Sequence, residues 1–540
     1  MAISNMTVTE SIAFKKEYLE VVNKGPPEEC LSLKERYEKA IEKSCLFAVL
    51  FKNFVSTGDV DIETIGYAIN CRSSFLRRTA DAYLNEQSPF AVHLGMFVTT
   101  ILGQGTPDQQ AEWLPSALDM QIVGTYAQTE LGHGTFIRGL ETTATYDPES
   151  EQFVLHTPTL SAHKWWPGGL GKTANHAVVI AQLYTKGECH GTHPFIVQIR
   201  DRETHMPLPG IRVGEIGPRM GYINADNGFL GFDHVRIPRE NMLMKNAPGD
   251  GTYVKKSHKK MTYGTMVFIR VILVNDAAFN LAKAVTIAVR YSAVRRQCQP
   301  NPDASEPQIL DYITQQHKLF IGIATAHALQ LTSAWLWTTF AAVQLASFPM
   351  FFFFQLHALS SCLKALSTSD SLTLIEQCRF ACGGHGYMLS SRLPTLYGYV
   401  AGIRTNEGDY TILMLQCECF GSTWNNKEKL YVYYLRSSKY KKYNNQSLML
   451  FFLQYCSINE NDIVRLQQRY EELLALIRPN AVGLVDAFDI RDELLQSTLG
   501  AYDGRVYERL MAEAQKTPLN SEPVNKSFHT HLKPFMQGKL

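Results

Sequence analysis

The residue pattern of this sequence changes near residue 121 and again near residue 239, and this change most strongly limits how the chain can fold. Between these positions, short runs rich in β-branched and aromatic residues alternate with turns, as at residues 153–155, 177–183 and 229–237. Such runs are typical of β-strands, and no helix-length segment separates them as a Rossmann fold would require. The pattern predicts a central β-domain, either an antiparallel sheet or a small barrel.

Helical periodicity lies on both sides of this domain. Apolar residues recur at helical spacing over residues 31–54 and 91–102, and Thr106-Pro107-Asp108 is a start signal for a helix over 109–118. Helical spacing returns over residues 262–291 and again from residue 463. We therefore expect an α+β protein that is mainly α.

The length of 540 residues is too great for one hydrophobic core, so the chain should divide into domains. The expected parts are an N-terminal helical domain (1–119), the central β-domain (120–250), a helical bundle (251–416), an atypical insert (417–459) and a shortened C-terminal helical domain (460–540).

A long uncharged stretch lies between Lys318 and Lys364. Its length would satisfy a membrane span. However, polar side chains such as Gln330 and His357 interrupt it, and Pro349 breaks it. A helix that is hydrophobic all round can belong to a protein core or to a membrane, and we favour a buried helical hairpin. No stable membrane insertion is expected.

The charge balance gives no preference for nucleic acid or an acidic membrane, since 52 Lys and Arg residues face 51 Asp and Glu residues. Residues 424–443 do mix basic and aromatic side chains, which could bind single-stranded nucleic acid, but a solvated insert is the preferred interpretation. Eleven cysteines without a C-x-x-C pair indicate a reducing compartment rather than a disulfide framework or a zinc site.

Two familiar motifs do not meet their requirements. Gly171-Lys172-Thr173 resembles the end of a phosphate-binding P-loop, but Trp166 stands where that motif needs glycine. The histidines of this region lack the spacing of helix-borne zinc ligands, so no metal is expected. These histidines are His133, His156, His163 and His176.

A glycine cluster at residues 383–386 and a carboxylate at Glu407, which precedes an apolar helix, are candidates for a site. Glycines allow a cofactor to approach the backbone, yet they also form ordinary turns. A glutamate at a helix N-terminus is equally explained as a solvated charge that the helix dipole favours. Arg290, Arg295 and Arg296 end a helix, where they could bind an anionic ligand such as a pyrophosphate or cap the helix dipole.

We do not expect residues 1–20 to be a secretory signal, because no apolar run follows Lys15 and Lys16. The last residues, Gly538-Lys539-Leu540, differ in one position from the S-K-L tripeptide read by the peroxisomal import receptor. They are a weak indication of a peroxisomal address.

Several longer blocks together give a family resemblance. The chain resembles the acyl-CoA oxidases, the peroxisomal branch of the acyl-CoA dehydrogenase superfamily, roughly over residues 85–335, 356–416 and 460–540. The blocks are GTYAQTELGHG at 124–134, RGLETTATYD at 138–147, KWWPGGLGK at 164–172, RIPRENMLM at 236–244, YGTMV at 263–267 and RYSAVR at 290–295, in addition to the glycine cluster.

This resemblance implies the fold, the cofactor and the site. It implies a helical N-terminal domain, a β-domain and C-terminal helical bundles of acyl-CoA dehydrogenase type, with FAD between the β-domain and a bundle. Glu407 matches the catalytic base that would act on acyl-CoA, with oxygen as the electron acceptor and hydrogen peroxide as a product. The flavin-binding positions carried over are Thr129, Gly168, Arg295, Gly383 and Gly384.

The resemblance further implies a homodimer in which the glycine cluster and arginine helix of one subunit help bind the flavin of the other. It leaves open an acyl-CoA dehydrogenase that uses an electron-transfer flavoprotein, and a catalytically impaired homologue that only binds acyl-CoA. The sequence departs from the family at Asn406, where an aromatic residue is usual, and over residues 339–355 and 417–457.

Overall fold

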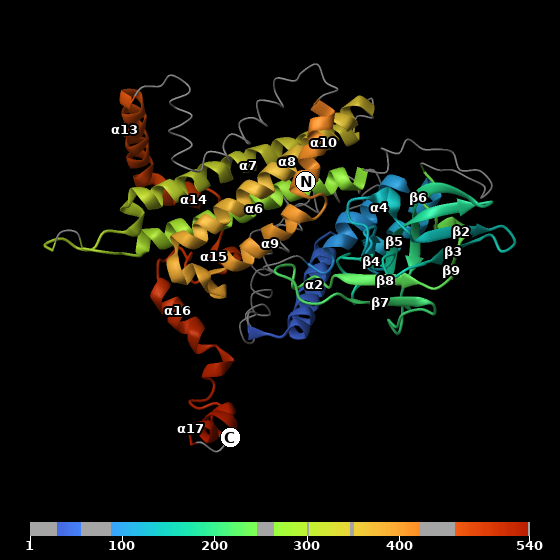
Figure 1. The fold of residues 1–540 in the computed structure, drawn as a ribbon, viewed down its shortest axis with the longest axis horizontal. Coiled ribbons are helices and arrows are strands. Elements are labelled where there is room, and N and C mark those ends of the chain that lie inside the picture. The colour runs from blue at the N-terminus through green and yellow to red at the C-terminus, as the bar shows by residue number, and fades with distance from the viewer. Residues whose placement is uncertain are drawn as a thin grey trace.

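The computed structural model describes residues 30–55, 88–245, 264–299, 302–345, 350–421 and 460–537. A β-domain lies at one end and a bundle of long helices at the other, with a helical arm extending away from the bundle (Figure 1). The predictions for residues 1–20, 424–443 and 538–540 lie outside the described residues.

The N-terminal part is helical, as predicted. It contains α2 (Leu33–Val55), the short π-helix η3 (His93–Phe97), α4 (Val98–Gln104) and α5 (Pro107–Leu118). The expected start signal of α5 is confirmed, because the Thr106 hydroxyl accepts a hydrogen bond from the Gln109 N–H while the Gln109 side chain accepts one from the Thr106 N–H. This capping box satisfies two donors that a helix N-terminus otherwise leaves unpaired.

The predicted β-domain is present, with its strands between Gly124 and Pro238. Its larger sheet has the order β1-β5-β2-β3-β9, with β6 paired to β5, and its smaller sheet has the order β4-β8-β7. The strands are β1 (Gly124–Ala127), β2 (Thr143–Asp147), β3 (Gln152–His156), β4 (Lys164–Trp165), β5 (His176–Thr185), β6 (Glu188–Gln198), β7 (Ile211–Glu215), β8 (Gly228–Phe232) and β9 (Val235–Pro238).

The expectation of purely antiparallel pairing is wrong for two pairs. One edge of β5 pairs first with β1 and then with β2, and both pairs are parallel. Parallel neighbours need a connection long enough to return the chain to the same end of the sheet. Here strands and irregular segments supply that connection, so the absence of long helices in the sequence did not exclude parallel pairs.

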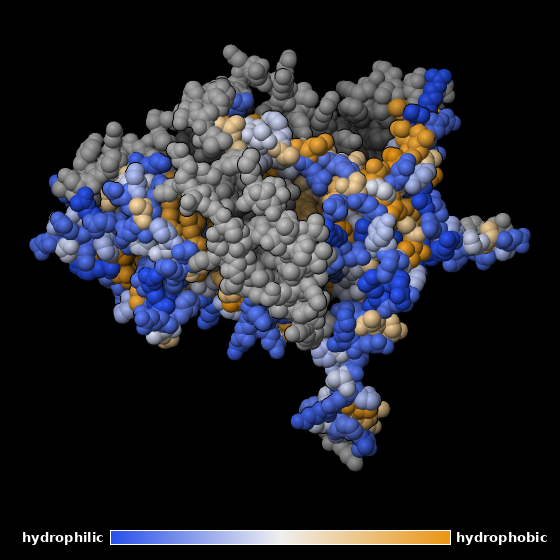
Figure 2. Space-filling model, turned by 180° about the vertical axis from the view of Figure 1, so that it is seen from behind, coloured by the Kyte–Doolittle hydropathy of each residue, from blue (hydrophilic) through white to orange (hydrophobic). Residues whose placement is uncertain are grey.

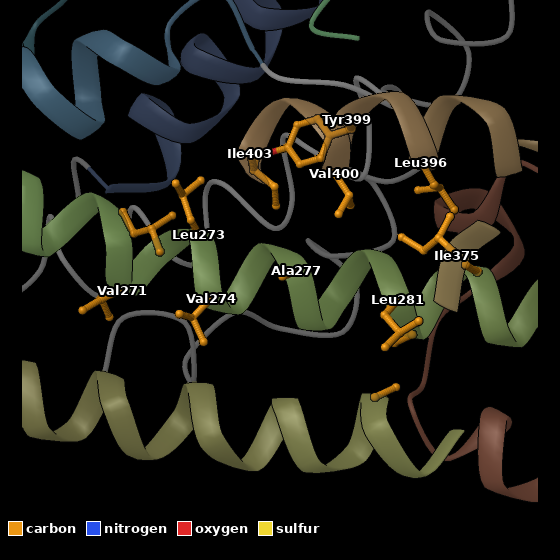
Figure 3. Close-up of a cluster of buried hydrophobic side chains, with 14 of the residues drawn as sticks. Val271, Leu273, Val274, Ala277, Leu281, Ile375, Leu396, Tyr399, Val400 and Ile403 are labelled. Atoms are coloured by element: carbon orange, nitrogen blue, oxygen red, sulfur yellow. The ribbon is translucent and has the colours of Figure 1, made fainter. Parts of the chain in front are cut away.

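The helical bundle is built on α6 (Gly264–Val294), α7 (Ile313–Leu345), α8 (Met350–Ala381) and α9 (Leu393–Thr405). Side chains of α6 such as Val274, Ala277 and Leu281 are fully buried. Figure 3 shows α9 lying over α6, with Leu396, Val400 and Ile403 directed toward it. The helix predicted over residues 262–291 therefore lies at the centre of this core, which continues into α4 and α5.

The uncharged stretch forms the predicted helical hairpin, made of α7 and α8. Its complete burial, however, is not confirmed. By length and composition both α6 and α7 could cross a membrane; 78% of the apolar window of α6 is buried inside the protein, but only 39% of that of α7. Leu331 and Trp335 of α7 are 74% and 52% exposed. One face of α7 thus lacks a partner among the described residues.

The remaining α-helices of the described residues follow α9 in the chain, and the last two lie in the arm that extends away from the bundle (Figure 1). They are α10 (Tyr410–Gly421), α13 (Glu460–Ile477), α14 (Ala481–Asp486), α15 (Asp492–Leu495), α16 (Val506–Gln515) and α17 (Lys533–Met536). Arg290 at the end of α6 joins this part to the core, because its guanidinium donates to Asp486, Asp492 and the Gly500 carbonyl. Hydrophobic side chains remain on the outer surface beside α13, where Leu466 and Leu476 are exposed (Figure 2).

His93 connects the N-terminal helices to the β-domain. Its Nε2 lies 2.9 Å from the Ala117 carbonyl and its Nδ1 accepts a hydrogen bond of 2.9 Å from the Gly124 N–H. This pattern requires the neutral ring, and burial lowers the pKa of His93 to about 4, with the Ala117 carbonyl opposing the shift. Only the uncharged side chain fits this junction.

His93 should make stability depend on pH. Between its pKa of about 4 in the folded state and 6.5 in the unfolded state, only the unfolded chain binds the proton. Stability is therefore lost as pH falls through this window, by up to about 1.4 kcal/mol per pH unit for one site. We expect His93→Gln to reduce the slope of apparent melting temperature against pH in this window. An unchanged slope would contradict this origin.

Candidate active site

Glu407 lies in the short connection between α9 and α10. Its backbone has φ 53° and that of Gly408 has φ 109°, so the chain turns through left-handed conformations at both residues. Such a conformation is unfavourable for a residue with a side chain and persists only when surrounding contacts hold it. The surroundings of this turn therefore decide where the carboxylate points.

The electrostatics of Glu407 suit a base. Burial raises the pKa of its carboxyl, while the positive charges of Arg270 and Lys364 oppose this shift. A carboxylate with a raised pKa is a stronger proton acceptor near neutral pH than an exposed one. No described group accepts a hydrogen bond from the Glu407 N–H, so a donor is available beside the carboxylate.

Two buried cations on neighbouring helices bind backbone carbonyls of this turn. Lys364 of α8 donates to the carbonyls of Asn406 and Gly408, each at 2.6 Å, and to the Arg404 carbonyl at 3.3 Å. Arg270 of α6 donates through Nε to the Glu407 carbonyl at 3.0 Å. The side chains therefore contact the backbone on both sides of Glu407.

A loop of the β-domain reaches the same end of α9. The rings of Tyr222 and Tyr399 stack with centroids 4.9 Å apart, and the Asn406 side-chain amide donates to the Tyr222 hydroxyl at 3.4 Å. A Cβ added at Gly221 would lie 2.6 Å from the Gly398 carbonyl, so glycine permits this close backbone approach. Glu407 thus lies where the β-domain meets the bundle.

Thr129 and Gly168 lie on neighbouring segments of the β-domain. The Thr129 carbonyl accepts a hydrogen bond of 2.9 Å from the Trp165 N–H, and the Gly168 carbonyl accepts one of 2.7 Å from the Thr125 hydroxyl. A fully buried ion pair at 3.0 Å between Glu130 and Lys164 joins the same two segments. The structure therefore brings these two predicted flavin-binding residues together.

Arg295, Gly383 and Gly384 form a second group at the far end of the bundle. The Tyr291 hydroxyl, one turn before Arg295, lies 3.0 Å from His385 Nδ1 in the turn that follows α8. Gly383 has φ 58°, and a Cβ at Gly384 would meet no atom within 4 Å. Tyr507 and Tyr291 raise the pKa of Arg295, which keeps its positive charge. Open space beside glycine and a fixed cation fit the adenosine and pyrophosphate parts of FAD.

Gly383 and Gly384 are well separated from Glu407 within one chain. From Lys364, which contacts the Glu407 turn, α8 continues to Ala381 just before the glycines. This part of the helix is about 25 Å long at 1.5 Å per residue. No described contact joins Glu407 to Gly383 or Gly384. Arg290, also considered for an anion, is instead engaged by Asp486 and Asp492.

The rejected motifs have other partners. The N–H groups of Lys172 and Thr173 donate to the Asp226 carboxylate, so both donors are already paired within the protein. Potential metal ligands converge in two places among the described residues, and no ion was expected at either. The two groups are His156, Asp233 and His234, and Glu130, His133 and Glu141.

The sequence did not predict a role for Lys364, Arg270 or the Glu130–Lys164 pair. A signal existed for two of them: Lys364 ends the long uncharged stretch, and Arg270 is the single charge in an apolar segment that opens α6. Charged residues are seldom buried without a partner, so an isolated charge in an apolar helix indicates a paired or functional group. Their partners, however, lie far away in the sequence.

Family models match most of the chain. The acyl-coenzyme A oxidase N-terminal model covers residues 16–123, the acyl-CoA oxidase C-alpha1 model covers 263–420, and the acyl-CoA oxidase model covers 440–537. The central β-domain lies between the first two matches.

Relatives and solved structures agree with these matches. The chain is 39% identical to acyl-coenzyme A oxidase 1 of Drosophila melanogaster, over 98% of this chain and 95% of the relative. It is 40% identical to human peroxisomal acyl-coenzyme A oxidase 1, over 94% and 92%. The Drosophila alignment has 644 positions against 540 residues here, so the relative contains segments that this chain lacks.

The fold is similar to Arabidopsis thaliana acyl-CoA oxidase 1, with TM-score 0.83, 34% identity and coverage of 99% and 96% of the two chains. It is also similar to acyl-CoA oxidase-1 of Caenorhabditis elegans, solved with FAD and ATP, with TM-score 0.84, 32% identity and coverage of 98% and 93%. The chain belongs to the acyl-CoA oxidase family.

Proposed function

We propose that Glu407 is the base that removes the α-proton of a fatty acyl-CoA in this enzyme. The chain is an FAD-dependent acyl-CoA oxidase of the peroxisome, which acts on a CH–CH bond with oxygen as the acceptor. The observation that carries the assignment is a carboxylate of raised pKa, beside a free backbone N–H, at the junction of the β-domain and the bundle.

Glu407 contributes two groups to the proposed reaction, its carboxylate and its backbone N–H. The Glu407 carboxylate takes the proton next to the thioester carbonyl, and the N–H of the same residue donates to the thioester oxygen as negative charge develops there. FAD, when bound, supplies the acceptor for the β-hydrogen as hydride. The products are a trans-2-enoyl-CoA and, after oxygen accepts the electrons, hydrogen peroxide.

Thr129 and Gly168 are proposed to contact the flavin ring from the β-domain. Arg295 is proposed to pair with the FAD pyrophosphate, and Gly383 and Gly384 to admit its adenosine half. The fixed charge of Arg295 and the open space at Gly384 support these roles.

Gly384→Ala tests this assignment. Its Cβ would meet no protein atom within 4 Å, so the protein without cofactor should keep its stability. If the adenosine half lies against this backbone, the added methyl group should weaken FAD binding by about 1–3 kcal/mol, the usual cost of overpacking. FAD titration of the apoprotein measures the effect. Gly103→Ala, which also has open space, is the matched control. Equal FAD affinity in both variants would exclude Gly384 from the cofactor site.

A homodimer is proposed as the active form. Gly383 and Gly384 follow a part of α8 that is about 25 Å long and begins at Lys364, which contacts the Glu407 turn. This distance suits contact with the flavin of a second copy better than contact with the flavin beside Glu407 of the same chain. The exposed apolar face of α7, with Leu331 and Trp335, offers surface for such a contact. Light scattering of the purified protein should give the mass of two chains, and a monomer that retains FAD would refute the shared site.

The alternatives differ in observable ways. An acyl-CoA dehydrogenase would reduce an electron-transfer flavoprotein and would release little peroxide with oxygen alone. A catalytically impaired homologue would bind acyl-CoA without turnover. The deciding experiment is a flavin spectrum of the purified protein, followed by a peroxide assay with palmitoyl-CoA and oxygen. A yellow protein that releases peroxide is expected; a colourless protein or absence of peroxide would overturn the oxidase assignment.

A further inference from the structure

Lys364 is the most completely enclosed charged group near the proposed base. It lies on α8 in the core, its side chain is fully buried, and its ammonium reaches the carbonyls of Arg404, Asn406 and Gly408. A lysine ammonium has three N–H donors and no acceptor. The three carbonyls therefore match its hydrogen-bonding capacity, and each belongs to the segment that carries Glu407.

The three carbonyls lie on both sides of Glu407, so their contact with Lys364 influences the direction of the Glu407 side chain. Two precede Glu407, and the third belongs to the residue that follows it. The last carbonyls of α9 have no partner within the helix, and a cation at that end is favoured by the helix dipole. By binding the backbone on both sides of a left-handed residue, the ammonium opposes relaxation of the turn.

The charged groups that act on Lys364 come from α6 and from the turn between α9 and α10. They are Arg270 on α6, and Glu407 and Asp409 in the turn. Arg270 also contacts Ser361 and His357 of α8. Burial lowers the pKa of Lys364 to about 7, Glu407 and Asp409 raise it, and Arg270 lowers it further. Lys364 and Glu407 therefore stabilise each other's charged forms.

We propose that Lys364 is a positioning residue of the oxidation reaction, because its ammonium holds the backbone on both sides of Glu407 and so aims the carboxylate at the substrate. This inference rests on the proposed role of Glu407 as the base. Lys364 does not touch the reacting atoms. It acts through the turn and through its charge.

Lys364→Met tests the proposal, since methionine has a similar length but no donor and no charge. We expect kcat to fall by about tenfold to a hundredfold, as expected when a catalytic group is misplaced, while FAD content and the KM for acyl-CoA change by about twofold at most. Removing the positive charge also raises the pKa of Glu407, so the acidic limb of the kcat profile should move to higher pH. A purely structural lysine would not move that limb.

Lys283→Met is the matched control, because Lys283 is a buried lysine of α6 and lies more than three turns from Arg270 along that helix. It should keep both kcat and the pH profile. Should Lys364→Met not fold, Lys364→Gln is measured by the same criteria, since its amide retains two donors without charge.

Three outcomes would overturn the proposal: a Lys364 variant with unchanged kcat and pH profile, a loss of FAD in proportion to the loss of activity, or the same losses in Lys283→Met. The Glu407→Gln variant is assayed in parallel. If Glu407→Gln keeps its activity, the assignment of the base has failed. If it is inactive while Lys364→Met and Lys364→Gln are fully active, only the positioning role has failed.

Discussion

Replacing Glu407 by glutamine is expected to leave a folded, yellow protein whose turnover with acyl-CoA is lower by about a thousandfold. The amide has the shape of the carboxyl group but accepts no proton at neutral pH, and a positioned general base contributes roughly 10²–10⁴-fold to a rate. The Lys364 and Arg270 contacts go to backbone carbonyls, so the substitution leaves them in place. Binding of FAD should therefore persist.

The measurement combines the flavin spectrum, peroxide release and anaerobic bleaching of the flavin by acyl-CoA. Glu112→Gln is a suitable control, since Glu112 is an exposed glutamate of α5 far from the turn in the sequence. The control should match the unmodified enzyme in all three measurements. Flavin bleaching at the normal rate in Glu407→Gln would show that another group takes the proton.

Lys164→Met should cause the largest loss of stability. The side chains of Lys164 and Glu130 are both fully buried at 3.0 Å, and Lys164 also donates to the Ile180 carbonyl at 2.7 Å. Burial alone would raise the pKa of Glu130, but Lys164 and Thr142 outweigh it and lower that pKa. Removing Lys164 leaves the buried Glu130 carboxylate without its lysine counter-charge, and breaking a buried ion pair in this way costs about 3–5 kcal/mol.

The apparent melting temperature and the FAD content measure this effect, because the ion pair joins the segments that carry Thr129 and Gly168. A double-mutant cycle provides the control. In the background of Glu130→Gln no negative charge is left unpaired, so Lys164→Met should cost clearly less there. Equal losses in both backgrounds would mean that the lysine acts through its carbonyl contacts rather than through the ion pair.

Much of the architecture could be predicted from local pattern. The helical spacing over residues 262–291, the strand-like runs between 121 and 239, and the cap at Thr106 all correspond to observed elements. These features depend on neighbours within a few residues, so a single sequence contains their cause. Family resemblance supplied the site residues, which no periodicity could have identified.

Other features depend on which distant segments meet. The parallel pairing of β1 and β2 with β5 follows from chain crossings that no local pattern records. In the sequence, Lys364 only marks the end of an uncharged stretch. Its contacts with the turn after α9 exist only once α8 and α9 pack together. The exposure of one face of α7 could not be predicted from local pattern either, because the composition of α7 resembles that of the buried α6.

The sequence by itself determined the succession of helical, β and helical parts, the family, and the identity of Glu407 as the candidate base, because each is recorded in local spacing or in long matching blocks. Only the tertiary structure decided the environment of that base. Its raised pKa and its left-handed turn depend on Arg270 and Lys364, which approach from two other helices. Desolvation and hydrogen bonding act over a few ångströms in space, so they exist only once the bundle has packed.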